Sequence, residues 1–200
     1  MRRIAICAAA LASSALLMLP AASGAFKFGA KLDRDPDNSA PPHDCSKDGG
    51  EIASPCTRVL VASDTGLVDN HLTSPKTGKL TKIRVRAGAA GSVRFKLIRL
   101  KDPNPTTHTI KGKAVAKSKV FQVQGNGFNA TNAIESFAVN MTVHKGDYLG
   151  FDSSKTSVLR CSSGGTRQFL FNPPLAVGDP FQTTTSAGSC TLMVQAIGHT

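Results

Sequence analysis

Two short segments of this 200-residue chain place basic side chains at every second position. The cations are Lys82, Arg84 and Arg86 in the first segment and Arg94 and Lys96 in the second. Successive side chains of a β-strand point to opposite faces, so each segment predicts a strand with one apolar and one cationic face. The connection 87–91 has the length of a hairpin, and an antiparallel pair would gather all five cations on one face. Such a face would attract phosphate- or sulfate-bearing polymers, acidic polysaccharide or an anionic membrane surface.

The sequence around these strands concentrates the positive charge of the chain. Residues 76–119 carry 13 basic side chains and one acid, Asp102, whereas the whole chain has 24 basic and 13 acidic residues and a net charge of +11. The cations either keep an exposed sheet soluble and prevent edge pairing, or they bind an anionic cell-envelope polymer or surface. We expect no specific nucleic-acid binding, because the chain has no Trp, a single Tyr and no aromatic side chain on the cationic face for base stacking.

Four cysteines follow the first 25 residues: Cys45, Cys56, Cys161 and Cys190. They allow three pairings, among which loop closure weakly favours Cys45 with Cys56 and Cys161 with Cys190. Either disulfide would contribute on the order of 3 kcal/mol by constraining the unfolded chain. A zinc site is the alternative, but no CxxC or HxxxH spacing accompanies these residues.

Enzymatic motifs are poorly represented. The GxSxG motif of α/β-hydrolases is absent from the sequence. Residues 162–165 together with His43 superficially resemble the Ser and His segments of trypsin-like proteases, but Ser162 stands where an Asp is expected before the nucleophile. We therefore predict no catalytic residue, and a hydrolase whose site lies in loops is the alternative.

The acidic segment 33–37 has the alternating carboxylates of a calcium loop. Pro36 would stiffen such a loop, and Asn38 replaces the glycine of its sharp turn, so we predict neither a metal site nor a cofactor. The segment belongs to an irregular, Pro-rich arm predicted over residues 26–55. Its carboxylates could fold against the basic face of the same molecule and screen it.

Residues 1–25 predict a cleaved signal peptide. Arg2 and Arg3 precede an apolar run, 4–19, that is too short to span a bilayer, and small residues at 23–25 suit signal peptidase. Export would place the remaining chain in an oxidising compartment, where disulfides form. No later apolar run approaches 18 residues, so we expect a secreted protein without a transmembrane anchor, either released or associated with the cell surface.

Short β-branched and aromatic runs alternate with turn-forming residues from Thr57 onward, which is typical of an all-β sandwich. The predicted strands are 57–62, 79–86, 92–100, 114–123, 134–143, 148–152, 157–161, 167–171 and 190–197. They predict an antiparallel, jelly-roll-like sandwich of about eight or nine strands over residues 56–200.

Several segments carry a resemblance to a known group of proteins. They are VHKGDYLGFD at 143–152, TKIRVR at 81–86, GSVRFKL at 91–97 and PPLAVG at 173–178. Together they resemble uncharacterised secreted β-sandwich proteins of high-GC Gram-positive bacteria, over roughly residues 60–197. The matched motifs belong to turns and strands, so the resemblance implies a fold and a bacterial origin and no catalytic residue.

The sequence thus predicts a secreted, non-catalytic binding or envelope-associated module that holds anionic polymers or surfaces through its basic sheet face. The first alternative is a secreted hydrolase acting on an extracellular polymer. The second is a purely structural protein, in which the cations serve solubility alone.

Overall fold

The computed structural model describes residues 24–37, 56–104, 109–125, 127, 134–153, 158–161, 164–184 and 186–200. Within these ranges the chain forms thirteen strands and one 3-10 turn, η1 (Val68–Asn70). All sheet pairings between these strands are antiparallel, which confirms the predicted all-β sandwich. No helix of the described ranges has the length and apolar character needed to cross a membrane.

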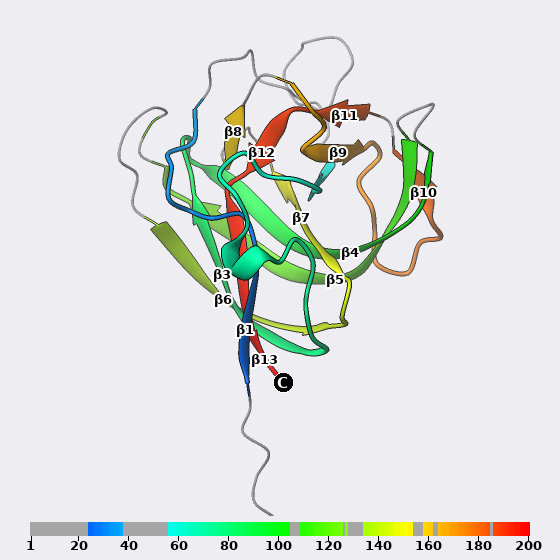
Figure 1. Cartoon of the computed structure of the whole chain (residues 1–200), viewed down its shortest axis with the longest axis horizontal. Coiled ribbons are helices and arrows are strands. Elements are labelled where there is room, and N and C mark those ends of the chain that lie inside the picture. Colours follow the sequence, from blue (N-terminus) through cyan, green and yellow to red (C-terminus); the bar gives the residue numbers. More distant parts are fainter. Residues whose placement is uncertain are drawn as a thin grey trace, which may run out of the picture.

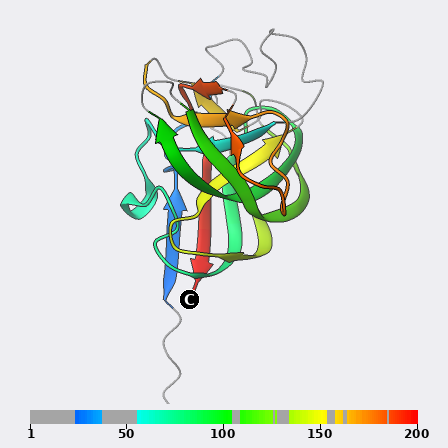
Figure 2. The ribbon, with the colours of Figure 1, turned by 90° about the vertical axis from the view of Figure 1, so that its right-hand side faces the viewer.

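One layer is a four-stranded sheet. Its order is β1 (Ala25–Gly29), β13 (Val194–His199), β3 (Gly78–Arg86) and β6 (Ile134–Val143). Figure 2 shows β1 and β13 side by side, with the strongly curved β4 and β5 of the other layer crossing in front of this sheet.

The second layer is a curled sheet of seven strands (Figure 1). Its order is β10 (Gln182–Thr183), β5 (Thr109–Val123), β4 (Gly91–Asn104), β7 (Tyr148–Ser153), β2 (Thr57–Leu60), β9 (Gln168–Phe171) and β11 (Ser186–Gly188). A separate pair joins β8 (Leu159–Cys161) to β12 (Cys190–Leu192).

The segment 190–197, predicted as one strand, is divided between β12 and β13. Met193 separates them: its amide donates to the Val158 carbonyl at 3.0 Å, and its carbonyl accepts from the Arg86 amide at 3.1 Å. The chain therefore leaves the small β8–β12 pair at Met193 and enters the four-stranded sheet.

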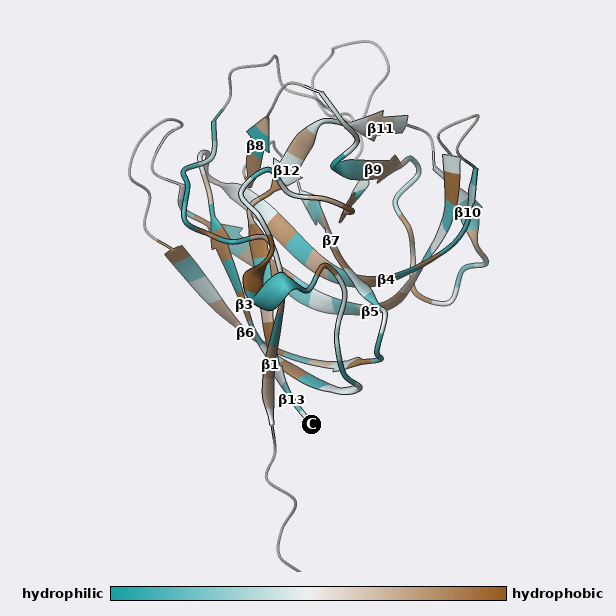
Figure 3. Cartoon of the chain, viewed as in Figure 1, coloured by the Kyte–Doolittle hydropathy of each residue, from teal (hydrophilic) through white to brown (hydrophobic). Residues whose placement is uncertain are grey.

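Apolar side chains cover both faces of the seven-stranded sheet. The larger core lies between the two main sheets and includes Phe95, Leu97 and Phe151. A smaller core lies on the opposite face, where Ile98 and Leu175 pack together with Val59, Ile110, Ala114 and Phe171. The alternation of apolar and polar residues along the strands is visible in Figure 3. Because the seven-stranded sheet is covered on both sides, a polar residue on its second face is not automatically exposed to solvent.

The segment 26–55, predicted to be an irregular arm, begins with a strand. Phe26 and Phe28 are 5% and 0% exposed and belong to the larger core, while Lys27 between them points to solvent. The strand ends at Gly29, whose φ of 105° suits glycine and where a Cβ would lie 2.6 Å from the Val194 carbonyl oxygen. Residues 31–37 are irregular, and 38–55 lie outside the described residues.

The predicted pairing of Cys161 with Cys190 is confirmed. These two cysteines face each other in the β8–β12 register and form a disulfide across 29 residues of sequence. Cys56 is also disulfide-bonded, and Cys45, its predicted partner, lies outside the described residues. No cluster of three or more metal-ligating side chains occurs in the ranges that the structure describes.

The position of β1 predicts a large cost for truncating its buried ring. Phe28→Ala should lower the free energy of unfolding by about 3–5 kcal/mol, because it removes a fully buried phenyl group from the core. Lys27→Ala, one residue away on the exposed face, should change it by less than about 0.5 kcal/mol. Denaturant unfolding with the disulfides intact measures both. Equal small effects would show that β1 is not part of the folded core.

Candidate anion-binding surface

The five cations predicted to share one face are distributed over two sheets. Lys82, Arg84 and Arg86 lie on β3, which pairs with β13 and β6. Arg94 and Lys96 lie on β4, which pairs with β5 and β7. The predicted hairpin between β3 and β4 is therefore wrong, and so is the single face of five cations.

The connection between β3 and β4 passes from one sheet to the other. Ala87 is buried in the larger core, and the Gly88 carbonyl accepts a hydrogen bond of 2.7 Å from the Gly127 amide. At Gly125 an added Cβ would lie 2.4 Å from the Ala89 backbone, so the segment after β5 packs closely on this connection. These contacts fix the connection where it passes from one sheet to the other, although its length alone would fit a hairpin.

Four cations share the solvent face of the four-stranded sheet, and we call this set the outer basic face. Its members are Lys27, Lys79, Lys82 and Arg84. Lys27 and Lys82 occupy one cross-strand row because both are register partners of Ile197. Strands lie about 4.8 Å apart, so the α-carbons of these two lysines are about 10 Å apart.

The strands that carry the outer basic face contain little negative charge. The sequences of β1, β3 and β13 contain no acidic residue, and β6 contributes Glu135, whose carboxylate accepts hydrogen bonds from the Gln124 and Gly125 amides. Among the described residues, Lys27, Lys79 and Lys82 form no ion pair. Arg84 donates to the Gln195 side-chain oxygen at 3.2 Å, which leaves its charge uncompensated.

Arg86 is separated from the other cations of β3 by its contacts. Its Nη1 lies 2.8 Å from Asp35 Oδ1, and its Nε donates to the Leu32 carbonyl at 2.7 Å. Asp37, from the same acidic segment, pairs with Arg160 at 2.8 Å. Two carboxylates of the segment considered above as a calcium loop, Asp35 and Asp37, thus neutralise arginines, and Asp35 screens one of the five predicted cations.

Lys96 lies beneath the segment that follows β9 and is 3% exposed. Its Nζ lies 2.7 Å from Asp152 Oδ2 and 3.1 Å from Thr57 Oγ1, and it also donates to the Leu175 carbonyl oxygen. Thr57 Oγ1 donates to Asp152 Oδ1 at 2.6 Å and accepts from the Leu175 amide at 2.9 Å. Lys96 is therefore part of a buried polar cluster and unavailable to an external anion.

The surroundings of Lys96 disfavour its charged form. Burial lowers the pKa of its ammonium group, and this effect exceeds the raising effect of the hydrogen bond and charge of Asp152. Arg94 and Lys117 lower the pKa further by charge repulsion. Arg94 is itself half-buried, and its Nε has no hydrogen-bond partner among the described residues.

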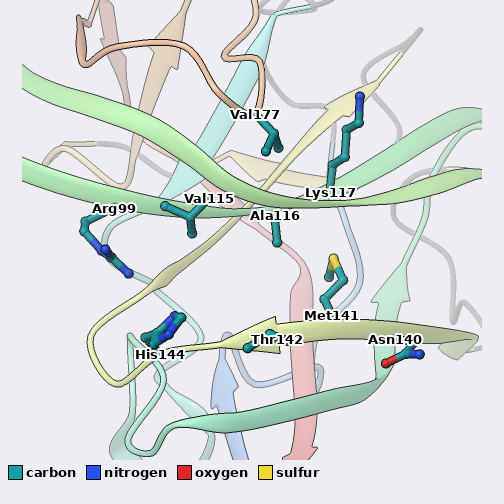
Figure 4. A pocket seen from close by; sticks show the side chains of 9 residues that line it. All are labelled: Arg99, Val115, Ala116, Lys117, Asn140, Met141, Thr142, His144 and Val177. Carbon is teal, nitrogen blue, oxygen red and sulfur yellow. The ribbon is translucent and has the colours of Figure 1, made fainter.

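A cleft of about 500 Å³ lies where β5 and β6, consecutive in sequence but in different sheets, diverge (Figure 4). Val115 and Asn140, which line it, are both at register irregularities of their strands. Arg99 and His144 lie near one end, and none of the described residues that line the cleft is acidic. This described lining thus lacks the carboxylate pair that a glycoside hydrolase uses.

Sequence reasoning missed Lys27 and Lys79 as members of the basic surface. Lys27 follows the predicted cleavage site and lies within the range predicted to be an irregular arm, although the alternation Phe26-Lys27-Phe28 is typical of a half-buried strand. Lys79 lies at the start of a predicted strand, outside the residues 82–96 that the predicted hairpin would bring together.

No protein-family model matches the chain, and no curated protein or solved structure matches it significantly. The resemblance to secreted bacterial β-sandwich proteins therefore stays a prediction.

The exposure of Lys79 and Lys82 and the burial of Lys96 predict how these lysines react with an amine-reactive reagent. An amine-reactive acylating reagent applied to the native protein should modify Lys79 and Lys82, which are exposed, and should leave Lys96 unmodified. Peptide mass mapping after brief labelling measures this difference. Labelling of Lys96 at a rate comparable to that of Lys82 would contradict its buried position.

Proposed function

We propose that this protein is a secreted, non-catalytic binding module that attaches to an anionic polymer or surface of the cell envelope through its outer basic face. The observation that carries the proposal is the set of four cations on one sheet face whose strands β1, β3 and β13 contain no acid. Buried cations such as Lys96 have no part in this function.

The weak binding expected from four exposed cations favours a partner that carries many closely spaced anionic groups. A Lys or Arg near an anionic surface contributes about 1 kcal/mol, so four such residues supply about 4 kcal/mol, equivalent to a Kd of about 1 mM. Binding of this strength retains a protein only where anionic groups are dense, as they are along a polymer or on a surface. Attraction between exposed charges also weakens with salt, because the Debye length falls to about 8 Å at physiological ionic strength.

Charge reversal tests the proposal. The variant Lys27→Glu/Lys82→Glu/Arg84→Glu should bind roughly 100-fold more weakly at low salt, because three cations of about 1 kcal/mol each are lost. We would measure retention of the purified protein on anionic and neutral cell-wall polymers, acidic liposomes and DNA across a salt series. Wild-type retention on one anionic class, weakening with salt, is the expected result.

The matched control is Lys101→Glu/Lys111→Glu/Lys145→Glu, which makes the same change in net charge at exposed positions outside the outer basic face. It should keep most of the wild-type retention. Equal loss in both variants would show that overall charge is responsible, and no wild-type retention at low salt would reduce the face to a device for solubility. Cleavage of any polymer during incubation would favour the hydrolase alternative.

A further inference from the structure

The buried cluster around Lys96 brings an amine, a carboxyl group and a hydroxyl group into mutual contact. Lys96 on β4 and Asp152 on the adjacent strand β7 lie 2.7 Å apart, and their side chains are 4% and 12% exposed. Thr57 on β2, the next strand of the same sheet, contacts both of them. The Leu175 backbone covers the cluster and contacts both Lys96 and Thr57.

From this geometry we propose that Lys96 and Asp152 condense to an intramolecular isopeptide bond that cross-links β4 to β7. In this reaction Nζ of Lys96 attacks Cγ of Asp152, the new Nζ–Cγ bond forms, and the Cγ–Oδ2 bond breaks. Oδ2 leaves as water with two protons from the pair, which starts as one ammonium and one carboxylate or as their neutral equivalents. The reaction needs no oxidant, reductant or additional reactant.

Thr57 is placed to relay a proton during this step. Its Oγ1 accepts from Lys96 Nζ at 3.1 Å and donates to Asp152 Oδ1 at 2.6 Å, so the hydroxyl connects the amine to the carboxyl group. The Leu175 amide, which donates to the same Oγ1 at 2.9 Å, fixes the hydroxyl oxygen between them. Proton transfer through Thr57 would move one proton from Nζ to Oδ1 as the amine attacks. Oδ2 would then take a second proton from Nζ and the proton of Oδ1, and leave as water while the carbonyl at Oδ1 forms again.

The product would fit the same site with its polar groups satisfied. The Thr57 hydroxyl can still donate to Oδ1, now an amide oxygen, and the remaining N–H of Nζ can still donate to the Leu175 carbonyl. The reaction replaces two buried charges by a neutral amide, which removes the desolvation penalty of an ion pair in an apolar interior. The apolar residues Ile98 and Leu175 of the smaller core exclude water from this face of the sheet.

Two properties of the cluster favour reaction over a permanent ion pair. Burial lowers the pKa of Lys96, which raises the fraction of neutral, nucleophilic amine. The fold also holds both groups in contact, and well-oriented intramolecular reactions reach effective molarities of about 10⁵–10⁸ M. Condensation that is negligible between separate side chains thereby becomes feasible within the folded protein.

Mass spectrometry of the purified wild-type protein tests the proposal. After reduction and denaturation, the intact mass should be lower by one water than the sequence requires, and a protease digest should contain a branched peptide that joins Lys96 to Asp152. The full sequence mass would overturn the proposal. A loss of water at another position, such as a succinimide at a different Asp, would also overturn it.

Variants assign the cross-link to these side chains. Lys96→Met and Asp152→Leu should each have the full sequence mass, whereas Lys117→Met, at the β5 position opposite Lys96 in register, should keep the loss of water. Thr57→Val should slow the reaction, so that newly made protein contains linked and unlinked forms whose ratio changes with time. Wild-type protein carries the decisive measurement, so a variant that fails to fold leaves the test intact. Immediate and complete linkage in Thr57→Val would remove the relay from the proposal.

Discussion

Lys96 imposes an electrostatic constraint on the strands around it, because its amine is enclosed between the seven-stranded sheet and the segment after β9. A buried polar group is tolerated only where it has partners, and those of Lys96 come from three separate parts of the chain: Thr57, Asp152 and Leu175. The cluster therefore joins β2, β4 and β7 and fixes the segment that covers them. The smaller core, including Leu175, forms under that segment.

Covering both faces of the seven-stranded sheet determines where the positive charge of the protein is accessible. On the second face Lys96 is enclosed and Arg94 is half-buried, so these two cations of β4 contribute little to the surface. The four-stranded sheet packs its inner face against the larger core, and its outer face exposes Lys27, Lys79 and Lys82. The proposed attachment to anionic polymers consequently belongs to the sheet that solvent reaches from one side.

The acidic segment before residue 38 shows how the remaining charge is balanced. Arg160 forms ion pairs with Asp37 and Asp64. Asp64 also accepts a hydrogen bond from the hydroxyl of Thr191, which is next to Cys190 of the Cys161–Cys190 disulfide. Asp35 likewise forms an ion pair with Arg86. Asp35, Asp37 and Asp64 thus lie in ion pairs near the disulfide and at the end of β3. The strands β1, β3 and β13, which carry the outer basic face, contain no acid of their own.

The sequence by itself determined the class of fold, most strand positions and the side chains that share a face within each strand. Strands such as β6 coincide with their predicted ranges because a period of two is local, and the Cys161–Cys190 pair could be anticipated from loop closure. Tertiary structure alone decided that β3 and β4 enter different sheets, that β1 completes a sheet, and that Lys96 is buried while Lys82 is exposed. Alternation says which residues point the same way, but the neighbours of a strand and the cover over its second face depend on contacts between residues far apart in sequence.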